Sequence, residues 1–121
     1  MKKKVLVVDD NRSNLMLEND LLEVAGYEVF QAENANDGIA IALKEKPDVI
    51  VMDVRLPDMR GSEAAMILRR DSETHSIPIV FVTASVMAEN KEEIKNIDNS
   101  GFISKPINTR TFAEEISQYI K

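Results

Sequence analysis

The chain has 121 residues, 44% of them hydrophobic and 30% charged, which suits one compact domain with its own core. It has no cysteine, which excludes disulfides, thiolate metal sites and a cysteine nucleophile. A net charge of −6, two Tyr, four Phe and no Trp argue against direct nucleic-acid binding. No apolar run approaches the ~20 residues that span a bilayer. We therefore expect a cytoplasmic protein that contacts neither nucleic acid nor membrane directly.

Four apolar runs each end at a side chain that can bind a metal ion or a phosphate. Runs without a polar face are typical of strands that are buried on both sides. A fifth segment, Tyr27–Ala32, alternates more, as an edge strand does. In chain order the four runs are Val5–Val8 before Asp9 and Asp10, Val49–Met52 before Asp53, Ile79–Val82 before Thr83, and Phe102–Ser104 before Lys105.

Helical segments separate the strands, and capping residues or breakers mark most of their ends. The expected helices begin at Asn11 or Ser13 and end at Gly26, run from Asn34 to Lys46, from Ser62 to Arg70 and from Val86 to Ile97, and begin again at Asn108 or Thr109. For the first helix we expect an apolar face of Leu17, Leu21, Val24 and Ala25, with Glu18 and Glu23 facing solvent.

Five strands alternating with helices predict a single α/β domain, a parallel sheet covered by helices on both faces. Ligands of such sheets bind outside the carboxyl ends of the strands, where Asp9, Asp10 and Asp53 would meet. Two carboxylates 4 Å apart repel by roughly 4 kcal/mol at an effective dielectric near 20, which favours a neutralising Mg²⁺ ion. Lys105 and Thr83 add an ammonium and a hydroxyl, the groups that hold a transferring phosphoryl.

These motifs, together with Pro57 and Gly61 downstream of Asp53 and the Thr83-Ala84 and Lys105-Pro106 pairs, resemble the response-regulator receiver domain of two-component signalling. The resemblance covers residues 1–121. It implies a doubly wound (βα)5 fold with strand order 2-1-3-4-5. It also implies that Asp53 accepts a phosphoryl group from a histidine kinase or a phosphotransfer protein, forming an acyl phosphate.

The resemblance implies a role for each residue of the site. The side chains of Asp10 and Asp53 and the backbone carbonyl of Arg55 would bind Mg²⁺, and Asp9 would act mostly through water. Thr83 and Lys105 would bind the phosphoryl oxygens. The bond between Lys105 and Pro106 would be cis.

The resemblance also implies a switch. Thr83 would move toward the phosphoryl group, and Phe102 would turn inward into the space that Thr83 vacates. This would change a partner-binding face made of the fourth helix, the fifth strand and the fifth helix. Arg55 and Ser85 lie two residues after Asp53 and Thr83, and we expect them to tune hydrolysis of the acyl phosphate. We expect a downstream protein target, and a monomer or a weak phosphorylation-dependent dimer.

Two other classes of protein remain as alternatives. A phosphatase-like hydrolase with an aspartyl nucleophile after the first strand would need a D-x-D pattern, but Asn11 occupies its third position. A flavodoxin-like cofactor binder would need a glycine-containing phosphate loop, which residues 11–14 do not supply. We therefore expect a signalling domain that catalyses only its own phosphorylation and dephosphorylation. The length and initial Met favour a stand-alone receiver, although a receiver cut from a longer regulator or hybrid kinase would have the same sequence.

Overall fold

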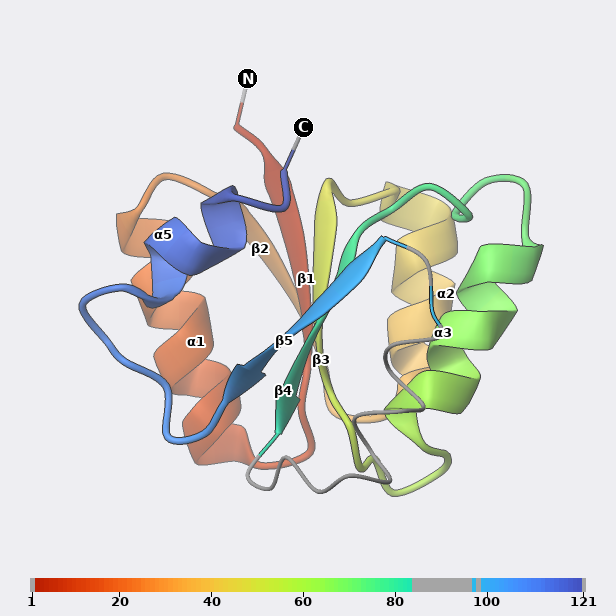
Figure 1. The fold of residues 1–121 in the computed structure, drawn as a ribbon, viewed down its shortest axis with the longest axis horizontal. Coiled ribbons are helices and arrows are strands. Elements are labelled where there is room, and N and C mark those ends of the chain that lie inside the picture. The colour runs from red at the N-terminus through yellow and green to blue at the C-terminus, as the bar shows by residue number, and fades with distance from the viewer. Residues whose placement is uncertain (1, 84–96, 98, 121) are drawn as a thin grey trace.

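The computed structural model describes residues 2–83, 97 and 99–120 (Figure 1). Its strands are β1 Lys4–Val8, β2 Glu28–Ala32, β3 Val49–Asp53, β4 Ile79–Thr83 and β5 Ser100–Ser104. The helices in the described ranges are α1 Arg12–Val24, α2 Ala35–Glu45, α3 Gly61–Arg70 and α5 Phe112–Ser117. The strands form one parallel sheet in the order β2-β1-β3-β4-β5, which confirms the predicted fold class and strand order.

Strand β3 lies at the centre of the sheet, between β1 and β4. Its residues Val49–Met52 are at most 1% exposed, because helices cover a central parallel strand on both faces. All five strands point the same way, so their carboxyl ends share one edge, the lower edge in Figure 1. The side chains that follow these strands are therefore collected at that edge.

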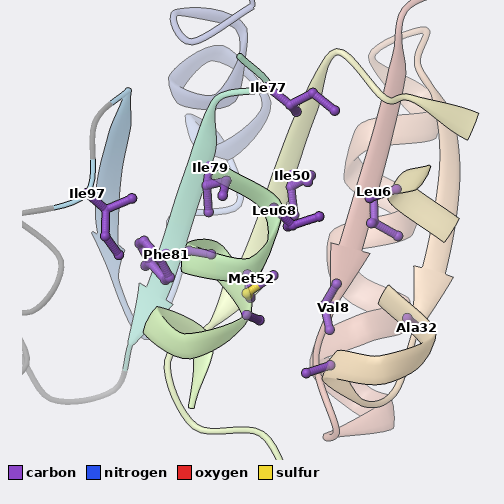
Figure 2. Packing of buried hydrophobic residues seen from close by; sticks show 14 of the residues in the cluster. Leu6, Val8, Ala32, Ile50, Met52, Leu68, Ile77, Ile79, Phe81 and Ile97 are labelled. Carbon is purple, nitrogen blue, oxygen red and sulfur yellow. The ribbon is translucent and has the colours of Figure 1, made fainter. Parts of the chain in front are cut away.

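Two hydrophobic clusters, one on each face, hold the helices to the sheet. Helices α2 and α3 cover one face and α1 and α5 the other (Figure 1). Figure 2 shows Leu6, Ile50 and Ile79 of three neighbouring strands in the first cluster, with Leu68 of α3 beside them. The second cluster contains Leu22 of α1 together with buried residues of α5. Each cluster therefore joins side chains that are far apart in the sequence.

The prediction for α1 is correct for Leu21, which packs against the second cluster, and for exposed Glu23, but it is wrong for the rest of the predicted face. Leu17 and Val24 are 40% and 90% exposed, whereas Glu18 is only 2% exposed. The buried residues of α1 are Leu15, Glu18, Asn19 and Leu22, which follow the i, i+3, i+4, i+7 spacing of one helix face. Two residues in the middle of that face are polar, so the sequence pattern favoured the neighbouring face, which contains Leu17, as the buried one. The burial of Glu18 matters for the site.

Two element boundaries also differ from the prediction. Strand β5 begins at Ser100, two residues before the predicted run at Phe102, because Ser100 and Gly101 pair with Ile79 and Val80 of β4. Helix α5 begins at Phe112 rather than near Asn108, after a turn in which the Phe112 N–H donates to the Asn108 carbonyl. The helix predicted from 86 to 97 lies outside the described residues, apart from Ile97. No helix in the described ranges is long and apolar enough to cross a membrane.

Candidate functional site

Three charged side chains meet where β1, β3 and β5 end. Asp9 follows β1, Asp53 ends β3 and Lys105 follows β5. The Lys105 Nζ donates hydrogen bonds to Asp53 Oδ2 at 2.9 Å and to Asp9 Oδ2 at 3.3 Å. Side-chain exposure is only 17% for Lys105, 13% for Asp53 and 2% for Asp9. Such shielded charges interact more strongly than charges on an open surface.

Backbone hydrogen bonds fix two of these groups. The N–H of Arg55 donates to Asp53 Oδ1 at 3.1 Å, which orients the carboxylate from the residue two positions downstream. The N–H of Lys105 donates to the carbonyl of Thr83 at 2.7 Å, which extends the pairing of β4 and β5 by one step. The peptide bond between Lys105 and Pro106 is cis. The hydrogen bond to Thr83 fixes the main chain of Lys105, from which the side chain reaches the two carboxylates.

Asp10 completes an acidic cluster with Asp9 and Asp53. One carboxylate oxygen from each of the three lies within 4.8 Å of the other two. Asp9 is buried and Asp10 is exposed, so the cluster reaches solvent through Asp10. Oxygen ligands of high negative charge are what Mg²⁺ and Ca²⁺ prefer, so these residues fit a hard divalent cation.

Burial and mutual charge set the ionisation of this group. Burial raises the pKa of the Asp9 carboxyl, and the hydrogen bond from the Asn11 N–H and the charge of Lys105 only partly oppose this rise. Burial opposes the charged form of Lys105, but the hydrogen bond and charge of Asp53, followed by those of Asp9, outweigh it and raise the pKa of the ammonium. Lys105 therefore stays protonated and neutralises part of the carboxylate charge.

Thr83 and Phe102 lie on the neighbouring strands. Thr83 is 5% exposed at the end of β4, in register with Ser104, and so sits at the same edge of the sheet as Asp53. Phe102 is half-buried in β5, paired with Phe81, and packs against the cluster under α2 and α3. Ser85 lies outside the described residues.

The loop between β3 and α3, residues 54–60, is closed at its base. The N–H of Gly61 donates to the carbonyl of Val54 at 2.7 Å, and Arg55 and Arg60 form an antiparallel bridge. The side chain of Arg55 is exposed. A Cβ on Gly61 would lie 2.5 Å from the backbone oxygen of Asp53, so only glycine allows this close approach.

Glu18 belongs to the site although the sequence prediction placed it in solvent. Burial raises its pKa to about 8, and the charge of Asp9 and a hydrogen bond with Asp9 add to this rise, while Lys105 opposes it. Glu18 is therefore mostly protonated at neutral pH. The signal that points to it is its spacing from Leu15 and Leu22 on the buried face. It also borders a hollow beside α1, lined by Asn14, Leu17, Glu18, Lys105, Pro106 and Ile107.

Comparison with known proteins agrees with this arrangement. The family model of the response regulator receiver domain matches residues 5–117. The polar-differentiation response regulator DivK of Brucella anthropi is 38% identical over 120 residues, which cover 99% of this chain and 98% of DivK. The chemotaxis response regulator CheY4 of Vibrio cholerae superposes with a TM-score of 0.92 at 33% identity, covering 99% of this chain and 100% of that one. A CheY-like receiver domain protein from Methanospirillum hungatei superposes with a TM-score of 0.90 at 30% identity, covering 98% and 93%.

The chain belongs to the response regulator receiver domain family. It is a receiver domain of two-component signalling, and its pocket of Asp9, Asp10 and Asp53 fits the phosphoacceptor aspartate and metal site of that class. This result favours the signalling domain over the hydrolase and the flavodoxin-like cofactor binder.

Proposed function

We propose that Asp53 is the residue that accepts a phosphoryl group from the phosphohistidine of a histidine kinase or a phosphotransfer protein. The observation that carries this proposal is the position of Asp53, 2.9 Å from Lys105 Nζ and clustered with two further carboxylates. In the transfer, an Asp53 carboxylate oxygen bonds to phosphorus while the phosphorus–nitrogen bond breaks. The imidazole leaves with the electron pair and takes up a proton.

The neighbouring residues divide the remaining tasks. The Lys105 ammonium and the Thr83 hydroxyl would hold the phosphoryl oxygens and balance their charge. The side chains of Asp10 and Asp53 and the carbonyl of Arg55 would hold Mg²⁺, with Asp9 acting mostly through water. Mg²⁺, when bound, supplies positive charge beside the phosphoryl oxygens.

Incubation with Mg²⁺ and acetyl phosphate, followed by mass spectrometry of the intact protein, tests this assignment. We expect the wild type to gain one labile phosphoryl group and Asp53→Asn to gain none, because the amide is not a nucleophile of this kind. Asp20→Asn, which changes an exposed residue of α1, is the matched control and should be phosphorylated like the wild type. Equal phosphorylation of Asp53→Asn would exclude Asp53 as the acceptor.

The proposed output is binding rather than catalysis on other substrates. We infer that residues 1–121 act as one cytoplasmic receiver domain, monomeric or weakly dimeric when phosphorylated. Its switch would couple Thr83 and Phe102 to a face that includes β5 and α5 and the segment 86–97, which lies outside the described residues except for Ile97. Ser85, also outside them, would tune hydrolysis with Arg55. Sustained turnover of p-nitrophenyl phosphate would argue instead for a hydrolase.

Arg55 offers a test of phosphoryl lifetime. Its N–H, not its side chain, holds Asp53, so Arg55→Ala should still be phosphorylated. We expect a shorter lifetime of phospho-Asp53, because the exposed cation would shield the phosphoryl group from water. Decay can be followed by intact mass after removal of acetyl phosphate, with Arg70→Ala, an exposed arginine at the end of α3, as control. Equal lifetimes in all three proteins would contradict this role.

A further inference from the structure

The exposed carboxylate of Asp58, in the loop between β3 and α3, forms hydrogen bonds with a different helix, α2. Its Oδ1 accepts a hydrogen bond from the N–H of Ala35 at 2.9 Å, and its Oδ2 accepts one from the N–H of Asn36 at 2.8 Å. Both donors belong to the first turn of α2. These two bonds lower the pKa of Asp58, so its carboxylate is charged at neutral pH. Nothing in the sequence pattern singles out this residue.

Asp58 completes the capping of α2. The first amide groups of a helix have no partners within the helix and need acceptors from outside. Asn34 Oδ1 accepts from the N–H of Asp37 at 2.8 Å, which leaves the N–H groups of Ala35 and Asn36 to Asp58. A negative charge at this end also interacts favourably with the helix dipole. The N-terminus of α2 is thus capped by two residues, and only Asp58 comes from the loop between β3 and α3.

The same loop carries the part of the site that depends on the main chain. Arg55, three residues before Asp58, donates its N–H to Asp53 Oδ1 at 3.1 Å. The loop is closed at its base by the bond from the Gly61 N–H to the Val54 carbonyl, and Leu56 and Met59 pack partly against the core. The hydrogen bonds of Asp58 attach this loop to α2, whose Ala35 is fully buried in the core. These hydrogen bonds therefore fix the position of the loop relative to α2.

We propose that Asp58 is a positioning residue for the phosphorylation site, which holds the main chain of Arg55 in place by anchoring the loop to α2. The inference rests on the proposed function, because that proposal is what makes the Arg55 carbonyl a metal ligand. Among the described residues, Asp58 forms hydrogen bonds with Ala35 and Asn36, and none is seen between Asp58 and the carboxylates of the site. Its effect is indirect, through the geometry of residues 54–60.

The test compares Asp58→Ala with Asn34→Ala, which removes the other cap of the same helix without touching the loop. We expect similar losses of thermal stability from both, about 3 to 6 °C in Tm. Only Asp58→Ala should speed amide hydrogen exchange of Arg55 in metal-free protein. Only Asp58→Ala should raise the Mg²⁺ Kd, measured by calorimetry, by about tenfold, the lower end of the effect of removing residues that support metal ligands. Asp58→Asn keeps one acceptor and should lie between the wild type and Asp58→Ala in both measurements.

The outcomes separate this inference from the proposed function. If Asp58→Ala and Asn34→Ala leave Arg55 exchange and Mg²⁺ affinity alike, Asp58 is only a helix cap and the inference is wrong. If the wild type neither binds Mg²⁺ nor gains a phosphoryl group, the proposed function fails. Arg55 exchange in the metal-free variants then still decides whether Asp58 positions the loop.

Discussion

Gly61→Ala is expected to destabilise the protein by about 2 to 3 kcal/mol and to slow phosphorylation of Asp53. The new Cβ would lie 2.5 Å from the carbonyl oxygen of Asp53 and 3.2 Å from the Cα of Val54. Both atoms belong to the backbone, so relief requires β3 and the start of α3 to move apart. The higher helix propensity of alanine returns at most about 1 kcal/mol. Urea unfolding and the rate of phosphorylation by acetyl phosphate measure the two effects.

Gly26→Ala is the control for Gly61→Ala. Gly26 has φ of +100° and open space around its Cβ position, so alanine there is strained by its backbone alone, by about 1 to 2 kcal/mol. Gly26 follows α1 at the edge of the sheet away from the acidic cluster, so the phosphorylation rate should stay at the wild-type value. A Gly61→Ala protein that unfolds at the wild-type urea concentration and is phosphorylated at the wild-type rate would show that the loop adapts without cost.

The sequence predicted the sheet well because of how parallel strands are buried. Residues Val49–Met52 lie in the middle of the parallel sheet and are buried on both faces, so neither face has to be polar. An unbroken apolar run in the sequence is therefore a direct signal of such a strand. The polar residue that ends such a run lies at the carboxyl edge for the same reason. Asp9, Asp53 and Lys105 could therefore be placed together before any contact was known, and the ion pairs between them confirm that placement.

The errors arise where tertiary contacts override local pattern. Ser100 and Gly101 have low strand propensity, and they extend β5 because β4 offers backbone partners. A Cβ at Gly101 would also meet the hydroxyl and ring edge of Tyr119, so a larger residue there would require Tyr119 to move. Asp58 sits in a loop whose residue types do not indicate that it reaches a helix 22 and 23 residues earlier in the chain. Such contacts depend on the assembled fold and leave no periodic signal.

Glu18 is the clearest case, because a buried acid contradicts the rule that charged residues face water. The structure resolves the contradiction through protonation. Burial, followed by the charge of Asp9, raises its pKa to about 8 from an ordinary value of 4.5, while Lys105 opposes the rise. Between these two values the folded protein holds a proton that the unfolded chain has lost. The stability therefore falls as pH rises through this range, by ~1.4 kcal/mol per pH unit at most.

Glu18→Gln should remove this pH dependence, because the amide keeps the shape of the protonated acid and cannot ionise. We expect the variant to be more stable than the wild type by on the order of 3 kcal/mol at pH 9, and within about 0.5 kcal/mol of it near pH 4.5, where Glu18 carries its proton in the folded state. Urea unfolding in EDTA at pH 4.5, 7 and 9 measures the difference without metal at Asp9 or Asp53. Glu28→Gln, an exposed glutamate of β2, removes the same charge and should keep the wild-type trend, because Glu18 is intact. A constant difference between Glu18→Gln and the wild type across the three pH values would show that folding does not raise the pKa of Glu18, and would contradict this prediction.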